Sequence, residues 1–210
     1  MTIKTRNIAD SAVTAAKIAA GAVTVSKLSS TMQKGTIQLP LNSWRVTDNA
    51  NTDVGLVAAT ALIGSGGVMG IDAEPSLIRV NAATDKKTRL VYLDAKLDPI
   101  FNDFVIPADA DVASAFTFKI LAAMSGTNNA TSVLTLVWVA VKAGTYAAGS
   151  DQGSATTAFA AVTTLVEKSI TIAAAAINAP GTTVSVELTP TSPGTDNMHI
   201  YGTWVEYTRV

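Results

Sequence analysis

From Gly35 to the C-terminus, short runs of aliphatic, β-branched and aromatic residues are separated by Gly, Pro, Asn, Asp and Ser. The pattern predicts a linker or first strand over residues 35–41 and strands over 54–63, 76–80, 88–93, 101–106, 112–124, 132–141, 162–172, 182–188 and 198–208. Many short strands without helical spacers are typical of two packed antiparallel sheets. We therefore expect an all-β domain over residues 35–210, an antiparallel β-sandwich of jelly-roll-like type.

Two of these strands predict what each face of a sheet contacts. Phe116, Phe118 and Ile120 alternate with more polar residues, which indicates one buried face and one wetter face. The run over residues 132–141 is apolar on both faces, since Leu134, Leu136 and Trp138 alternate with valines. A strand of an antiparallel sandwich usually has water on one side. The second face is therefore expected to contact another subunit or a covering loop of the same chain. The predicted subunit interface consists of Val133, Val137, Val139 and Val141.

Residues 1–34 follow a different pattern, in which Ile8–Lys17 is repeated as Ile18–Lys27. The large apolar residues recur every five positions, which suits neither a helix face nor a strand face. Thr14 and Thr24 can each cap a short helical turn, and such a turn is unstable alone. We expect an arm that docks on the surface of another protein or on copies of itself around a threefold axis; a disordered Ala-rich leader is the alternative. The predicted docking residues are Ile8, Val13, Lys17, Ile18, Val23, Lys27 and Leu28.

Composition excludes several classes of protein. The formal net charge is −1 and the Lys and Arg residues are scattered, so no nucleic-acid partner is expected. There is no cysteine, which removes disulfides, thiolate nucleophiles and Cys-type zinc sites. The N-terminus lacks the apolar stretch of a signal peptide, and the apolar window 54–71 is interrupted by five glycines, so no membrane partner is expected. Charged residues make up only 15% of the chain, which suggests that part of its surface is covered in an assembly.

Catalytic patterns are nearly absent. The single histidine, His199, is predicted to be a solvated strand residue that lies with Tyr201 opposite Met198, Ile200 and Trp204. The glycine-rich stretch 64–70 lacks the Gly-Lys-Ser/Thr ending of a phosphate loop and indicates a turn. A set of aspartates lacks calcium-loop spacing and is interpreted as loop caps; its members are Asp94, Asp98, Asp103, Asp109 and Asp111. We therefore expect no enzyme activity, catalytic residue, cofactor or metal site.

The repeat over residues 8–24 resembles the N-terminal segments of tailed-bacteriophage virion proteins, including fibre and head-decoration proteins. Other segments also resemble a phage structural-protein family: residues 34–41, 79–86, 121–126 and the terminal 204–209. The resemblance implies a homotrimeric virion component with a jelly-roll-like domain.

The shortness of the arm favours one position on the particle. About 20 repeat residues reach at most about 70 Å, whereas a host-reaching fibre needs a long shaft. The first hypothesis is therefore a capsid decoration or cement protein, a homotrimer docked on the major capsid protein or another virion protein. The alternative is a short tail or head fibre whose β-domain is a knob that binds a host surface glycan, with Trp44, Tyr146 and the loop 125–131 as candidates. A polysaccharide-cleaving domain is the third hypothesis and would require paired carboxylates.

Overall fold

The computed structural model describes residues 33–47, 53–54, 67–68, 76–79, 88–92, 99–127, 132–141, 153–160, 163–173, 179–191 and 196–210. Side chains are described over the same ranges except residues 46–98 and positions 132, 141 and 191. The predicted arm, with its seven docking residues, lies outside the described residues apart from Gln33 and Lys34. No helix within the described ranges is long and apolar enough to span a membrane.

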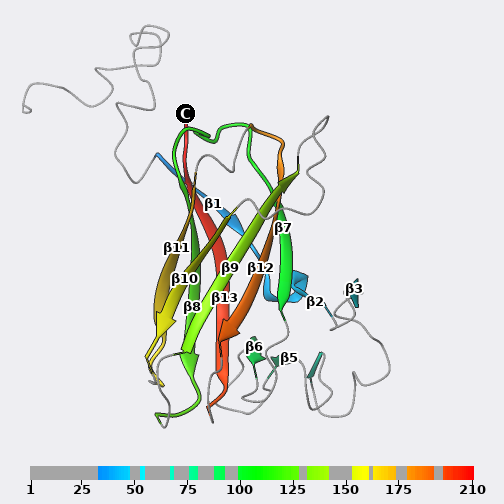
Figure 1. Ribbon diagram of the computed structural model, residues 1–210, viewed down its shortest axis with the longest axis vertical. Helices are drawn as coiled ribbons and strands as arrows, with labels where there is room; N and C mark the ends of the chain where they lie inside the picture. Colours follow the sequence, from blue (N-terminus) through cyan, green and yellow to red (C-terminus); the bar gives the residue numbers. More distant parts are fainter. Residues whose placement is uncertain are drawn as a thin grey trace, which may run out of the picture.

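The described elements form two antiparallel sheets (Figure 1). The seven-stranded sheet contains β1 (Lys34–Gln38), β4 (Gly67–Val68), β5 (Ser76–Arg79), β6 (Thr88–Tyr92), β8 (Phe116–Met124), β11 (Val166–Ile172) and β13 (Met198–Thr208). The six-stranded sheet contains β2 (Arg45–Thr47), β3 (Asp53–Val54), β7 (Ile100–Val105), β9 (Ser132–Val141), β10 (Gly153–Phe159) and β12 (Thr183–Thr191). A 3-10 turn, η4 (Leu41–Ser43), connects β1 to β2.

The strand order confirms the predicted fold class. Strands β6 to β13 give the order β11-β8-β13-β6 in one sheet and β10-β9-β12-β7 in the other. Consecutive strands therefore cross between the sheets, except at the β9–β10 hairpin, which is the connectivity of a jelly roll. The fold is an antiparallel β-sandwich of jelly-roll type.

The core lies between the two sheets and follows the predicted alternation. Phe116, Phe118 and Ile120 on β8 are fully buried, as are Leu134 and Leu136 on β9. Their partners on β12 and β13 in the same core include Val184, Val186 and Val205. Each buried aliphatic or aromatic side chain contributes about 1.5–3 kcal/mol relative to an exposed one, so this row holds the two sheets together.

Strand β10 was missed in the sequence, where no strand was predicted between residues 141 and 162. Its residues are small and polar, with Phe159 as the one large apolar side chain. Pairing with β9 specifies it instead, with Gly153 opposite Trp138 and Phe159 opposite Ser132. A Cβ at position 153 would lie 2.5 Å from the Trp138 ring, so glycine is required for this indole to pack beneath the strand.

The beginning of β8 also differs from the prediction. The expected strand started at residue 112, but Val112 and Ala113 lie in a turn and the strand starts at Phe116. Asp111 holds this turn, because its carboxylate accepts hydrogen bonds from the Ala113 backbone N–H (3.0 Å) and the Ser114 hydroxyl (2.6 Å). These bonds, the Ser114 hydroxyl first, lower the pKa of Asp111.

Candidate ligand-binding site

A break in the seven-stranded sheet lies beside the middle of β13. Strand β8 pairs along one edge of β13, from Met198 to Glu206. The other edge is shared by two strands: β6 pairs with residues 198–200, and β1 pairs with residues 204–208. Residues 201–203 therefore lie between the end of one partner strand and the beginning of the other.

The middle of β13 also contains a β-bulge. Ile200 pairs with Ala122 and Gly202 pairs with Leu121, so Tyr201 is the extra residue. The bulge shifts the alternation of every residue that follows it. Thr203, Val205 and Tyr207 are buried, and Trp204 pairs with Lys119 on the outer face.

The bulge overturns one expectation and leaves another intact. His199 and Tyr201 are partly exposed opposite the buried Met198 and Ile200, as expected. Trp204 was predicted on the inner face with Met198 and Ile200, and this was wrong. A glycine inside a strand pattern is a known sign of a bulge, so Gly202 was the signal that could have corrected the prediction.

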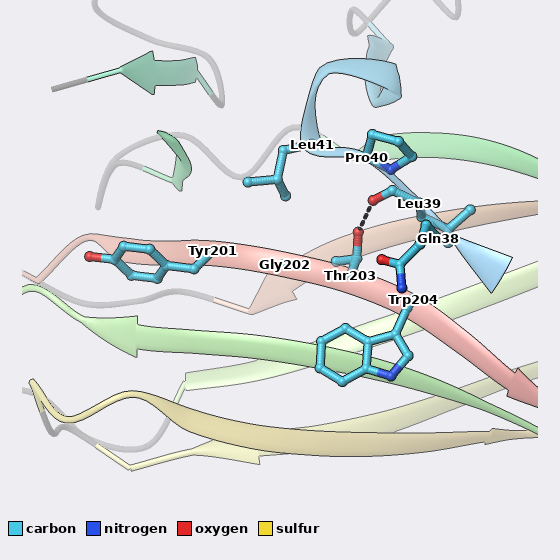
Figure 2. Close-up of a pocket in the computed structure, with 8 residues that line it drawn as sticks. All are labelled: Gln38, Leu39, Pro40, Leu41, Tyr201, Gly202, Thr203 and Trp204. Carbon is cyan, nitrogen blue, oxygen red and sulfur yellow. Dashed lines mark hydrogen bonds between the residues drawn. The ribbon is translucent and has the colours of Figure 1, made fainter. Parts of the chain in front are cut away.

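A pocket of about 430 Å³ occupies the break in the sheet (Figure 2). One wall comes from the end of β1 and the beginning of η4, and the other comes from β13. The lining residues are Gln38, Leu39, Pro40, Leu41, Tyr201, Gly202, Thr203 and Trp204. Binding sites for small molecules typically enclose about 300–1,000 Å³, so the volume suits a small ligand or one part of a larger one.

Hydrogen bonds across the break keep the two walls in place. The Leu39 N–H donates to the Thr203 carbonyl at 3.1 Å, and the Thr203 hydroxyl donates to the Leu39 carbonyl at 2.7 Å (Figure 2). The same hydroxyl accepts a bond of 2.9 Å from the Trp44 indole N–H. Because Trp44 is fully buried and packs edge-on against Phe118, this network ties the pocket to the core. The prediction of Trp44 as an exposed glycan contact was therefore wrong.

Trp204 and Tyr201 supply the aromatic surface of the site. Both are partly exposed and line the pocket together with Gly202, which adds no side chain. A Cβ built at position 202 would lie 3.7 Å from Cζ3 of Trp204, so the benzene half of the indole is beside this glycine. The indole N–H points the other way and donates to Glu206 Oε1 at 3.3 Å.

Charged groups lie beside the pocket but do not line it. Lys119, opposite Trp204, forms an ion pair of 2.8 Å with Glu167, which is about half exposed (49%). The hydrogen bond to Glu167 raises the pKa of Lys119, and the charge of Glu206 adds to the effect. Two carboxylates thus surround one ammonium group near the indole. We call this outer surface of the seven-stranded sheet the aromatic face; it comprises Gln38, Lys119, Glu167, His199, Tyr201, Trp204 and Glu206.

The predicted subunit interface lies on the outer surface of the other sheet. Val133, Val137 and Val139 are partly exposed there, and only the backbone of Val141 is described. Their neighbours in register are small or hydroxylated, apart from Glu187 opposite Val137. We call this surface the valine face; it comprises Val133, Thr135, Val137, Val139, Ser154, Thr156, Ala158, Ser185 and Thr189. Its role as a subunit interface stays a prediction.

Of the aspartates interpreted as loop caps, Asp109 and Asp111 make structural contacts, whereas the interpretation was wrong for Asp103, which lies within a strand. Asp109 forms an ion pair with Arg209 (3.2 Å) and accepts a hydrogen bond from the Tyr207 hydroxyl (3.0 Å), while Asp103 is exposed on β7. Within the described part of the chain, no group of three or more His, Cys, Asp or Glu side chains could hold a metal ion. Asp94, Asp98, Tyr146 and residues 128–131 lie outside the described residues.

The geometry defines a jelly-roll β-sandwich with an aromatic pocket on one outer face. No protein-family model matches the chain, and no curated protein matches it.

Among solved structures, the xylan-binding module CBM15 has a TM-score of 0.44 and 11% identity over 84% of this chain and 98% of the module. The enzymatically active domain of bacteriophage CBA120 tailspike protein 4 has a TM-score of 0.38 and 10% identity over 65% of this chain and 18% of that one. The arabinose-bound MgGH51 α-L-arabinofuranosidase has a TM-score of 0.44 and 11% identity over 63% of this chain. This chain spans only 22% of the arabinofuranosidase. Identities of this size concern the fold alone.

Proposed function

We propose that this chain is a non-enzymatic binding protein of a bacteriophage particle whose β-sandwich recognises carbohydrate on the host surface. One observation carries the carbohydrate part: two partly exposed aromatic residues, Tyr201 and Trp204, line a pocket together with Gly202. The face of a sugar ring presents C–H groups, and the negatively polarised face of an aromatic ring attracts them. Gln38, at the rim, offers both donors and an acceptor to sugar hydroxyls.

The virion part of the proposal rests on the repeat at residues 8–27 and on the other segments that resemble phage structural proteins. In this proposal the N-terminal arm binds another virion protein, and the sandwich faces the host. Deleting residues 1–32 tests this, because β1 and the bond from the Arg209 N–H to the Gln33 carbonyl remain. The truncated chain is expected to fold and bind sugar but to be missing from particles. Its incorporation at normal copy number would contradict the docking role of the arm.

The carbohydrate proposal is tested by titrating the full chain with surface polysaccharide from the host by calorimetry. Trp204→Ala is expected to weaken binding at least about tenfold, or roughly 1.4 kcal/mol. Phe101→Ala is the matched control, because Phe101 is also a partly exposed aromatic residue, lies beneath Arg45 and belongs to the other sheet. Equal loss in both variants, or no loss in either, would contradict the assignment of the site. Release of new reducing ends from the polysaccharide would replace the binding function with an enzymatic one.

A second candidate function, homotrimeric capsid decoration, is favoured by the valine face. Apolar side chains that stay partly exposed on a long central strand are a suitable contact for another subunit. Light scattering of the full chain is expected to give three times the chain mass of 21.6 kDa. A stable species of single-chain mass at micromolar concentration would remove this candidate and leave the carbohydrate proposal unaffected.

A further inference from the structure

The chemistry of the pocket walls narrows the class of sugar. We infer that the pocket takes an uncharged pyranose that carries a methyl group, as a 6-deoxyhexose or an N-acetylhexosamine does. This inference rests on the proposed carbohydrate function and on the same pocket. It follows from three properties of the described residues: an apolar wall, a polar rim and the arrangement of nearby charges.

The wall that faces β13 is apolar. Pro40 is exposed and Leu41 partly exposed along the turn that follows β1, and the buried Leu39 packs into the core behind them. Figure 2 shows Leu41 on the η4 side of the pocket, across from the β13 segment that contains Tyr201 and Gly202. A sugar hydroxyl placed against this wall loses its hydrogen bonds to water without a replacement, whereas a methyl group gains by leaving water.

The polar groups of the pocket are few and lie at its rim. The Thr203 hydroxyl already donates to the Leu39 carbonyl and accepts from the Trp44 indole, so its only proton is used inside the protein. Gln38 and the Tyr201 hydroxyl remain as side-chain groups that can orient a ligand. A ligand with one apolar substituent directed inward and hydroxyls directed outward matches this division.

The charges beside the pocket disfavour an anionic sugar. All eight lining residues are uncharged. Lys119, which pairs in register with Trp204, forms an ion pair with Glu167, and Glu206 binds the Trp204 indole N–H. Among these described side chains, a carboxylate or sulfate on the ligand would therefore meet two negative groups and a lysine whose charge Glu167 already neutralises.

The test compares sugars that differ only at carbon 6, titrated into the full chain by NMR or calorimetry. Methyl β-D-fucopyranoside carries CH₃ at this carbon, the galactopyranoside CH₂OH and the galacturonide a carboxylate. A second pair, methyl N-acetylglucosaminide against methyl glucoside, distinguishes the two sources of the methyl group. In at least one series the methyl-bearing sugar is expected to bind about five-fold or more tightly than its hydroxyl counterpart. The galacturonide is expected to bind at least about ten-fold more weakly than the fucoside.

A substitution in the apolar wall distinguishes sugar binding as such from the preference for a methyl group. Leu41→Asn keeps the size of the side chain and should remove the preference for the methyl group while retaining weak binding of both sugars. Gly202→Ala is the second variant, because the added Cβ makes only ordinary contacts and so keeps the fold, and it should weaken all sugars equally. Equal binding within both series, or a galacturonide that binds as well as the fucoside, overturns the inferred class and leaves the proposed function intact. If neither these sugars nor host polysaccharide binds, the proposed function and the inference both fail.

Discussion

The outer surfaces of the two sheets differ in the side chains that they present. The aromatic face has partly exposed rings at His199, Tyr201 and Trp204, with charged groups paired around them. The valine face has partly exposed valines on β9 surrounded by Ser, Thr and Ala, apart from Glu187 opposite Val137. Both faces expose apolar area, so this area alone does not distinguish a ligand site from a protein contact.

The two faces differ in whether the backbone forms a concave site. On the aromatic face, a break in strand pairing and a bulge create a concave pocket with rings on one side. On the valine face, β9 pairs without interruption with β10 and β12, so the backbone forms no such break. A regular pleated surface suits extended contact with another protein, whereas a small ligand needs an interruption that surrounds it.

Loss of the Trp138 side chain should destabilise the whole sandwich and therefore affect both faces. Trp138→Ala removes a side chain that is only 4% exposed and lies against Gly153, so it leaves a cavity and should lower the free energy of unfolding by about 3–5 kcal/mol. Within the described residues the Trp138 Nε1 has no hydrogen-bond partner. Trp138→Phe should therefore lose much less, because no hydrogen bond disappears. Chemical denaturation measures both variants, and equal losses would contradict this packing.

A charge on the valine face should act on assembly alone. Val137→Lys places an ammonium group opposite Glu187, so the separate subunit should lose less than about 1 kcal/mol of stability. If the valines are a subunit contact, the dissociation constant of the assembly should rise about 100-fold, or roughly 2.7 kcal/mol. Ser169→Lys, on the outer surface of β11, is the control and should leave assembly unchanged. Sedimentation equilibrium measures the effect, and unchanged assembly of Val137→Lys would show that the valines are not the contact.

A methyl group added at Gly202 should have opposite effects on folding stability and on sugar binding. In Gly202→Ala the new Cβ lies 3.7 Å from Trp204 and 4.0 Å from Leu121, which are ordinary contacts. The substitution should raise stability by about 0.5 kcal/mol, since glycine is the costlier residue in a strand. The same variant should bind sugar about three- to ten-fold more weakly and assemble normally. Thermal melting and sugar titration of one sample give both values, and weaker binding together with a lower melting temperature would indicate simple misfolding.

The smallest expected effect is the pH dependence of the Lys119–Glu167 pair. Because the pKa of Lys119 is raised in the folded chain, its contribution is complete below the unfolded pKa, near 10.5, and is lost as the pH rises through the folded value. Glu167 is about half exposed, so the contribution should stay below about 1 kcal/mol. The free energy of unfolding, measured by chemical denaturation, should be higher for wild type than for Lys119→Gln by a constant difference from pH 7 to 9. This difference should shrink above pH 10. A difference in stability that grows above pH 10 would contradict a stabilising ion pair between Lys119 and Glu167.

The sequence predicts the core better than the site. The bounds of β9 and β13 follow from their long apolar alternation, and the buried row on β8 follows from period two. Strand β10 could not be predicted, because its small residues show no hydrophobic alternation and the strand is specified by its pairing with β9. Trp204 was placed on the wrong face because alternation was counted through Gly202 without a bulge. Trp44 lies outside any long pattern, and only the fold shows that its indole reaches Thr203, 159 residues away in sequence.

The pairing of β1 with β13 determines how the domain would carry a pulling force. Their five register pairs run from Lys34 opposite Thr208 to Gln38 opposite Trp204, and Figure 1 shows the start of β1 near the C-terminus. A tether pulling at residue 34, resisted by a ligand held beside Trp204, draws the two strands past each other along their length. The pairs are then loaded in shear, so they share the force and rupture together. Under the proposed attachment, the short strand would thus act as a mechanical clamp between the arm and the pocket.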